Sequence, residues 1–197
     1  MDSPRMTPAI FLDRDGTLIR DVGYLSSEGQ IEVLPHVPQA LRLLKEKGFK
    51  LVVVTNQSAV ARGWLTEEKL ARIHEALVER LAQNGIHLDG IYYCPHHPTE
   101  GVVPYNISCS CRKPDVGLVE RAARELRLDP ARSYVIGDQV ADMELARRIG
   151  AKGIWIGGER PTGREPVRSY FVARDLKEAA RWIVDRIYDG GQIRGAE

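Results

Sequence analysis

Residues 9–24, AIFLDRDGTLIRDVGY, carry the pattern that decides the fold: four apolar residues run directly into Asp13, and a second carboxylate follows at Asp15. A short, continuous apolar run of this kind is typical of a strand buried on both faces of a parallel sheet. Gly16 and Thr17 then turn the chain. Two like charges so close together at a strand end repel each other, unless a cation lies between them or one carboxyl group is protonated.

Further apolar runs alternate with helical patterns along the whole chain. The amphipathic segment 66–85, for example, begins at Thr66 as N-cap and ends at Gly85. The predicted strands are 9–12, 51–54, 90–93, 134–136, 153–156 and 170–172, and the predicted helices are 37–48, 66–85, 117–127, 140–149 and 176–188. This alternation predicts an α/β three-layer sandwich with a central parallel, Rossmann-like sheet. We expect a single domain over residues 1–197, with irregular segments at 94–111 and 157–167 and a frayed tail at 189–197.

Polar residues follow three of the predicted strands. Asp13 and Asp15 end the first, Thr55 and Asn56 the second, and Asp138 the fourth. In open α/β sheets, ligands bind at the carboxyl ends of the strands. The sequence therefore predicts that these three motifs converge on one edge of the sheet.

The overall charge argues against nucleic acid as a partner. The chain has 28 Lys and Arg against 27 Asp and Glu, which gives a net charge of +1. A protein that binds nucleic acid through a broad basic face needs a larger excess of positive charge. There is also no apolar run of signal-peptide or membrane-spanning length. We expect a cytoplasmic monomer that binds neither membranes nor nucleic acid.

The paired carboxylates predict a site for a hard divalent cation. Mg²⁺ prefers oxygen ligands and usually binds one or two protein carboxylates, which leaves room for a substrate phosphate. Asp138 is the natural further ligand, whereas Asp142, one helical turn later, either reaches the same region or stays on the helix surface. Lys113, Thr55 and Asn56 offer partners for a phosphate. The alternative is that Asp13 and Asp15 merely cap a turn.

The three cysteines are clustered in the pattern C-x-H-x12-C-x-C. With one histidine they supply four ligands for Zn²⁺: Cys94, His96, Cys109 and Cys111. A closed set of four protein ligands is typical of a structural zinc site, because a catalytic zinc keeps one position open for water. His97 is the alternative nitrogen ligand, and reduced cysteines without a metal are the alternative to the whole site. The zinc loop, residues 94–111, leads directly into Arg112 and Lys113.

Over residues 10–149, the chain resembles the haloacid dehalogenase (HAD) superfamily of phosphohydrolases. The resemblance rests on four segments that occur in the order of the four motifs of that superfamily: FLDRDGTLI, VVTNQS, CRKP and IGDQVADM. The resemblance implies that Asp13 is a nucleophile that becomes an aspartyl-phosphate, and that Asp15 is general acid and then base. It further implies that Mg²⁺ is bound by the carboxylates of Asp13 and Asp138 and the carbonyl of Asp15. Thr55 and Lys113 would neutralise the phosphoryl oxygens, and Arg112 would be a further catalytic residue that recognises the substrate. His96 is favoured as the zinc ligand.

Within the superfamily, the chain is similar to a family of bacterial heptose bisphosphate phosphatases that have a zinc loop and no cap domain. The similarity is carried by the segments DRDGTLIRDVGY, VVTNQSAVARG, GIYYCPHHP and CSCRKPDVG. That resemblance implies removal of the 7-phosphate from a heptose 1,7-bisphosphate in heptose nucleotide biosynthesis. The implied substrate-binding residues are Asp21, Val22, Gly23, Tyr24, Thr55, Asn56, Gln57, Ser58, Arg112, Lys113 and Gln139. Gln139 replaces a lysine that is common in the family, which leaves the sugar anomer open.

Several alternatives remain at this stage. Histidinol-phosphate phosphatases share the DxDGT motif, the zinc loop and CRKP, although the long insert after His97 and the ARG that follows TNQS favour the heptose enzymes. Arg62, within that ARG, either binds the second phosphate or is a surface residue. A polynucleotide 3′-phosphatase is disfavoured by the charge balance, and a non-catalytic zinc-stabilised binding module is disfavoured by the intact acids and Lys113.

Overall fold

The computed structural model describes residues 6–157 and 170–191, and side chains through residue 187. A six-stranded parallel sheet forms its centre, in the order β3-β2-β1-β4-β5-β6. The strands are β1 (Ala9–Leu12), β2 (Lys50–Asn56), β3 (Gly90–Cys94), β4 (Tyr134–Gly137), β5 (Lys152–Ile156) and β6 (Tyr170–Ala173). The predicted irregular segment 157–167 lies, beyond its first residue, outside the described residues.

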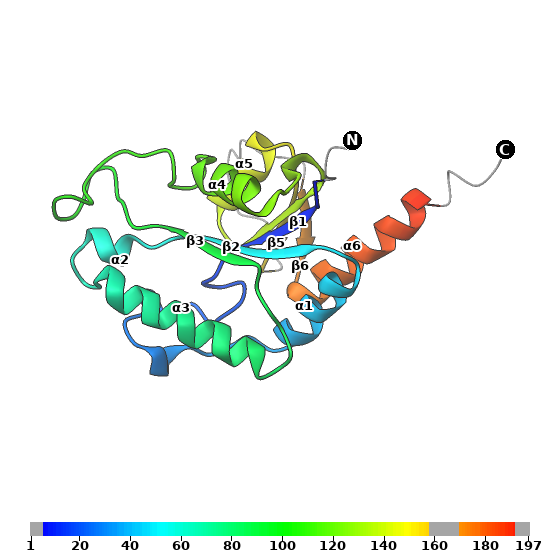
Figure 1. Ribbon diagram of the computed structural model, residues 1–197, viewed down its shortest axis with the longest axis horizontal. Helices are drawn as coiled ribbons and strands as arrows, with labels where there is room; N and C mark the ends of the chain where they lie inside the picture. Colours follow the sequence, from blue (N-terminus) through cyan, green and yellow to red (C-terminus); the bar gives the residue numbers. More distant parts are fainter. Residues whose placement is uncertain (1–5, 158–169, 192–197) are drawn as a thin grey trace.

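Helices cover both faces of the sheet (Figure 1). The α-helices are α1 (Val37–Glu46), α2 (Ser58–Ala61), α3 (Glu67–Ala82), α4 (Gly117–Leu126), α5 (Val140–Arg148) and α6 (Leu176–Gly191), and the short 3₁₀ helices are η1 (Glu28–Gln30) and η2 (Pro130–Arg132). In Figure 1, α4 and α5 lie above the sheet and α1, α3 and α6 below it. The predicted three-layer α/β sandwich is confirmed, and the described part of the chain contains no inserted cap domain.

The alternation of side chains along β1 explains why both faces are covered. Ile10 and Leu12 belong to the hydrophobic core formed with α1, α3 and α6, whereas Ala9 and Phe11 belong to the core formed with α4 and α5. All four side chains are fully buried. Because successive residues of a strand point to opposite faces, a strand between two helical layers must be apolar throughout.

Most predicted elements lie within one or two residues of their observed ends. Thr66 is the N-cap of α3, and its side chain accepts a hydrogen bond from the backbone N–H of Lys69 at 3.2 Å. The sequence patterns did not predict α2, η1 or η2, which are too short to show a periodic apolar face. The tail predicted to fray from residue 189 is still helical up to Gly191, and residues 192–197 lie outside the described residues.

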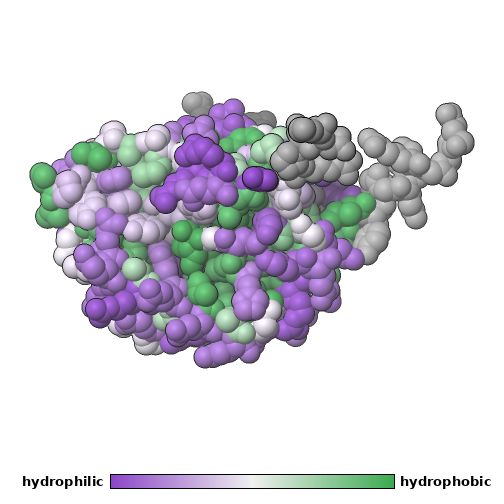
Figure 2. Space-filling view, viewed as in Figure 1, coloured by the Kyte–Doolittle hydropathy of each residue, from purple (hydrophilic) through white to green (hydrophobic). Residues whose placement is uncertain are grey.

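The surface in the orientation of Figure 1 is mostly hydrophilic, with smaller hydrophobic areas between the polar side chains (Figure 2). Among the residues that the structure describes, no helix has both the length and the apolar character needed to span a membrane.

Leu77 provides a test of the packing of α3 against the sheet. Its side chain is fully buried in the core shared with α1 and α6, while the next residue, Val78, lies at the exposed surface. We expect Leu77→Ala to lower the free energy of unfolding by about 3 kcal/mol, because it removes buried methyl groups and leaves a cavity. The matched control Val78→Ala should cost less than about 1 kcal/mol. Denaturant unfolding measures both, and equal losses would contradict the observed orientation of α3.

Candidate active site

The site lies where the order of the strands reverses. From β1 the chain moves outward through β2 to β3, and it then returns to β4 on the other side of β1. The crevice at the carboxyl ends of the strands on either side of such a switch point is a general ligand site in open α/β sheets. Asp13 directly follows β1 and Asp138 directly follows β4, so both residues lie at this crevice.

The centre of the site is an ion pair between Asp13 and Lys113. The Lys113 ammonium lies 2.9 Å from Oδ1 of Asp13 and 2.6 Å from Oδ1 of Asp142, and it donates to the carbonyl oxygen of Val54 at 2.8 Å. Burial would lower the pKa of this ammonium, but the two carboxylates outweigh burial and hold the pKa above its ordinary value. Lys113 is therefore positively charged although its side chain is only 3% exposed.

Asn56 fixes the position of Lys113 through its backbone. The Asn56 side chain donates to the carbonyl oxygen of Lys113 at 3.1 Å and accepts from its N–H at 3.0 Å. The carboxylate of Asp13 accepts, on Oδ1, from the backbone N–H of Arg14 at 2.8 Å. Within the described residues, the contacts of the Asp13 carboxylate go to Oδ1, which makes Oδ2 the candidate nucleophilic oxygen.

Asp138, which has a carboxylate oxygen within 4.8 Å of oxygens of Asp13 and Asp142, also has an unsatisfied oxygen. Its Oδ1 is buried without a hydrogen-bond partner among the described residues. Burial, together with the carboxylate of Asp13, raises the pKa of Asp138 to about 6. A Cβ atom on Gly16, where φ is +73°, would lie 2.0 Å from Oδ2 of Asp138, so only glycine permits this approach.

The charge balance of the cluster fits a divalent cation. Oxygen atoms of Asp13, Asp138 and Asp142 all lie within 4.8 Å of one another, and one lysine offsets only part of their negative charge. Burial raises the pKa of Asp142 to about 7 despite the nearby Lys113 ammonium. A buried, unpaired carboxylate oxygen is costly unless a cation binds it. The donors are all oxygen atoms, as Mg²⁺ prefers.

Asp15 lies on the same side of the chain as Asp13, but its side chain turns away. Arg14 binds it with two nitrogen atoms, and the nearest contact is 2.8 Å, from Nη2 to Oδ2. Gln57 donates from Nε2 to the same Oδ2 at 2.9 Å and to Oγ1 of Thr55 at 2.9 Å. The repulsion expected between the two aspartates is thus reduced, because the carboxylate of Asp15 is paired with Arg14.

A cavity of about 470 Å³ opens above these residues. It is lined by Asp13, Asp15, Asp21, Gly23, Tyr24, Thr55, Asn56, Ser58, Arg112, Lys113, Asp138, Gln139 and Ala141. Of the residues predicted to bind substrate, Val22 and Gln57 are outside this lining: Val22 is exposed, and Gln57 is buried beneath the cavity. The structure thus brings the four motifs together, while the roles of the individual residues stay predictions.

Sequence reasoning missed Arg14 as a part of the site. The signal was present, because Arg14 stands between two aspartates at the end of a buried strand, where a side chain between them can turn to the buried side. A charge at such a position requires partners, which the sequence could not identify.

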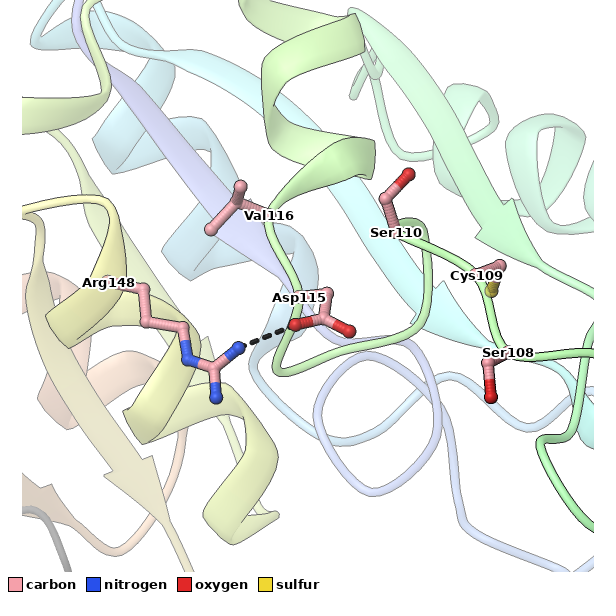
Figure 3. A pocket seen from close by; sticks show the side chains of 6 residues that line it. All are labelled: Ser108, Cys109, Ser110, Asp115, Val116 and Arg148. Atoms are coloured by element: carbon pink, nitrogen blue, oxygen red, sulfur yellow. Dashed lines mark hydrogen bonds and ion pairs between the residues drawn. The ribbon is translucent and has the colours of Figure 1, made fainter.

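A second hollow of about 610 Å³ lies elsewhere, beside the cysteine loop. Figure 3 shows Asp115 and Arg148, which come from separate segments and form an ion pair of 2.6 Å across it. This pairing neutralises both charges at the hollow. The remaining lining residues are Ser108, Cys109, Ser110 and Val116. Residues of all four motifs line the other cavity, where we place the candidate site.

The predicted zinc ligands meet at the end of β3. The three sulfur atoms are 3.1–3.5 Å apart, and Nδ1 of His96 lies 3.3 Å from the sulfur of Cys111 and 3.8 Å from that of Cys94. Burial raises the pKa of the Cys94 thiol, so this thiol would need a metal to become a thiolate. The cluster of four N and S donors fits Zn²⁺.

His97 is not part of this cluster, because its Nδ1 accepts from the backbone N–H of Glu100 at 3.0 Å and from that of Thr99 at 3.4 Å. His96 connects the cluster to the active site, since its carbonyl oxygen accepts from Nη1 of Arg112 at 2.9 Å. The cysteine loop therefore places Arg112 at the rim of the cavity.

Arg62 lies outside the cavity lining. It forms an ion pair with Glu100 of the cysteine loop, and its guanidinium group lies over the rings of Tyr24, at 5.8 Å, and Trp64, at 5.2 Å. These contacts connect the cysteine loop to the loop that contains Tyr24. They indicate that Arg62 holds the two loops together and does not bind the second phosphate.

Comparison with known proteins places the chain among phosphatases. The HAD-hydrolase-like family model matches residues 110–179. The chain is 42% identical over 181 residues to a D-glycero-beta-D-manno-heptose-1,7-bisphosphate 7-phosphatase from Yersinia pestis, covering 91% of this chain and 96% of that protein. It is 46% identical over 184 residues to a protein of the same name from Photorhabdus laumondii, covering 92% of each.

Among solved structures, a D,D-heptose 1,7-bisphosphate phosphatase from B. bronchiseptica, complexed with magnesium and phosphate, has a TM-score of 0.79 at 30% identity, over 91% of this chain and 99% of that one. The fold and the carboxylate site thus define a HAD-like phosphatase. Within that class, the chain belongs to the D-glycero-beta-D-manno-heptose-1,7-bisphosphate 7-phosphatase family.

The raised pKa of Asp138 predicts how stability depends on pH without metal. The pKa is about 6 in the folded protein and about 3.8 ordinarily, so the folded state holds this proton more tightly. The stability that the group contributes is complete below about pH 4 and is lost as the pH rises through 6. In EDTA at pH 7.5, Asp138→Asn should therefore stabilise the protein by about 1 kcal/mol, after allowing for solvent screening of a partly exposed group.

Thermal unfolding at pH 4 and pH 7.5 measures this difference, which should disappear at pH 4. Asp185→Asn, an exposed carboxylate on α6, is the control and should change neither value. A variant that is less stable than the unaltered protein at pH 7.5 in EDTA would contradict the unsatisfied environment of Asp138.

Proposed function

We propose that this protein is a Mg²⁺-dependent phosphohydrolase that removes the 7-phosphate from D-glycero-β-D-manno-heptose 1,7-bisphosphate. The observation that carries the proposal is the cluster of Asp13, Lys113 and Asp138, in which one buried carboxylate oxygen of Asp138 has no hydrogen-bond partner among the described residues. The chain is also closely related to phosphatases of that name. The names of these relatives specify the β anomer, which supports that choice where Gln139 had left the anomer open.

Asp13 and Asp15 have different roles in the reaction. Oδ2 of Asp13 attacks the phosphorus, forming an aspartyl-phosphate while the bond from phosphorus to the sugar oxygen breaks. Asp15 donates a proton to that oxygen and then accepts one from the water that hydrolyses the aspartyl-phosphate. Both residues line the cavity, so both reach the same substrate.

Charge neutralisation is the second requirement. Lys113, fixed by Asn56 and by two carboxylates, and the Thr55 hydroxyl face the transferring phosphoryl group. Mg²⁺, held by the carboxylates of Asp13 and Asp138 and the carbonyl of Asp15, would offset the charge of phosphoryl oxygens and carboxylates alike. Asp142 orients Lys113 and, through its other oxygen, accepts from the backbone N–H of Gln139 at 3.1 Å.

The rim of the cavity supplies recognition. Arg112 carries a guanidinium group that can bind a second, non-reacting phosphate in a bidentate manner. Asp21, Gly23, Tyr24, Ser58 and Gln139 offer further polar contacts for a sugar. We further propose that the zinc is structural and that the protein acts as a cytoplasmic monomer in bacterial heptose nucleotide biosynthesis.

Asp13→Asn tests the covalent mechanism. The amide cannot attack phosphorus, so we expect kcat for phosphate release from the heptose bisphosphate to fall by at least about 1,000-fold. The control is Asp185→Asn, which removes an exposed carboxylate and should keep the activity within about two-fold. Activity of the unaltered protein should also disappear in EDTA and return with Mg²⁺.

Near-normal activity of Asp13→Asn would exclude the aspartyl-phosphate. The α and β anomers of the heptose bisphosphate and histidinol phosphate should be compared in the same assay. A higher kcat/KM for histidinol phosphate would overturn the proposed substrate but not the chemistry.

Cys111→Ser tests the zinc site. The variant loses one of four ligands, and we expect zinc content to fall from about one equivalent to a small fraction of it, with a lower melting temperature. The matched control is Ser110→Ala, at the neighbouring residue, whose side chain is exposed. It should change neither the zinc content nor the melting temperature. Elemental analysis of protein purified without chelator measures the metal. Zinc well below one equivalent in the unaltered protein would contradict the closed site.

A further inference from the structure

Tyr24 lines the cavity from a segment that has few anchors of its own. Among the residues that the structure describes, the hydrogen bonds of residues 21–24 stay within the segment. The N–H of Gly23 donates to Oδ1 of Asp21 at 2.7 Å, and the N–H of Tyr24 donates to the carbonyl oxygen of Val22 at 3.1 Å. Tyr24 is also 45% exposed. Its position in the cavity therefore depends on contacts that its ring makes with other segments.

Trp64 makes the closest of these ring contacts. The rings of Tyr24 and Trp64 meet edge to face, with their centroids 4.3 Å apart and an angle of 85° between their planes. Edge-to-face packing is a favoured geometry for two aromatic rings, because the positive edge of one meets the negative face of the other. Trp64 is outside the lining of the cavity, so it can influence a bound substrate only through Tyr24.

Arg62 connects both rings to the cysteine loop. Its guanidinium group lies 5.8 Å from the ring centroid of Tyr24 and 5.2 Å from that of Trp64, within the range of a cation–π interaction. The same group forms an ion pair with Glu100. Nε of Arg62 is buried without a hydrogen-bond partner among the described residues, which costs free energy. The two rings and Glu100, rather than the hydrogen bonds of Nε, therefore hold the guanidinium group in place.

The cysteine loop that carries Glu100 is docked on the end of α2. The N–H of Val102 donates to the carbonyl oxygen of Ala61 at 2.7 Å. Gly101 has a φ of +115°, and a Cβ atom there would lie 2.1 Å from the same oxygen, so only glycine permits this approach. The docking places Glu100 beside Arg62, which directly follows α2.

We propose that Trp64 and Arg62 are positioning residues that hold Tyr24 as a wall for the sugar of the substrate, and that the cysteine loop sets this wall through Glu100. The inference rests on the proposed function, in which the cavity binds a sugar phosphate. The C–H groups of a sugar pack against an aromatic ring, and the gain is greatest when the ring is already held in place before binding. Because Trp64 and Arg62 lie outside the cavity lining, they act through Tyr24.

A wall of this kind affects binding of the sugar more than transfer of the phosphoryl group. Its contacts with the sugar are the same before and during the reaction, so losing them raises KM and leaves kcat almost unchanged. Inorganic phosphate has no sugar and needs only the phosphoryl position. Its inhibition constant, measured as a competitive inhibitor, should therefore not respond to the wall.

Two variants of Trp64 make the experiment specific. We expect Trp64→Ala to raise KM for the heptose bisphosphate about 5-fold, with kcat and the inhibition constant of phosphate within about 1.5-fold of normal. Trp64→Phe restores a ring edge for Tyr24 and should keep KM within about two-fold of normal. The control is Val103→Ala, which removes an apolar side chain of the cysteine loop that is 90% exposed and should leave KM unchanged.

Glu100→Gln tests the connection to the cysteine loop. It keeps the length of the side chain but removes the charge that pairs with Arg62, so KM should rise about 2-fold to 3-fold at low salt, with kcat unchanged. An unchanged KM in this variant would overturn the part of the inference that concerns the cysteine loop. Thermal melts check that all variants are folded.

A Tyr24→Ala background separates positioning from general damage. Without the wall, Trp64→Ala should change KM less than about 1.5-fold, since both effects act through one ring. An unchanged KM in Trp64→Ala, an equal rise in KM and in the inhibition constant of phosphate, a Trp64→Phe variant as weak as Trp64→Ala, or a full effect in the Tyr24→Ala background would each overturn the inference.

The proposed function is tested separately by the unaltered protein. If it prefers histidinol phosphate to the heptose bisphosphate, the proposed substrate is wrong. The same variants are then measured with histidinol phosphate, and a normal KM in all of them shows that the wall serves the sugar alone and overturns it for this protein.

Discussion

The Lys113 ammonium, buried between the carboxylates of Asp13 and Asp142, is the interaction on which the site depends. One positive charge cannot balance three acidic side chains that lie within 4.8 Å of one another, and Asp138 keeps an oxygen without a partner. The folded chain therefore holds an excess of negative charge at the switch point of its sheet. This excess is the physical basis of our proposal that the site binds a cation, and through it a phosphate.

The cysteine loop serves the same ion pair from a distance. Its last residues lead into Arg112 and Lys113, and Arg112 donates to the carbonyl oxygen of His96 within the cysteine cluster. The loop has little apolar core of its own, but Tyr105 binds Glu67 of α3 at 2.8 Å. A closed set of four ligands would add the rigidity that a loop of this length lacks, and the cluster would thereby help to hold Lys113 in place.

Particular residues show how far sequence patterns reach. The strand-end aspartates, Lys113 and the four cysteine-cluster ligands were predicted because each stands at a fixed offset from a strongly patterned strand or motif. Gln57 was predicted to bind substrate, yet it lies beneath the cavity and binds Asp15 and Thr55. The difference arises because a polar side chain in a loop can point either way, and only its neighbours decide which.

By itself, the sequence determined the layered α/β fold, the family resemblance and the residues that meet at the edge of the sheet, since strand periodicity and motif order are local properties of the chain. The tertiary structure alone decided the partners of the buried charges. Arg14 meets His74 across 60 positions of sequence, and Lys113 meets Asp142 across 29. Such pairs depend on how helices pack on the sheet, and side-chain packing is a property of the whole fold.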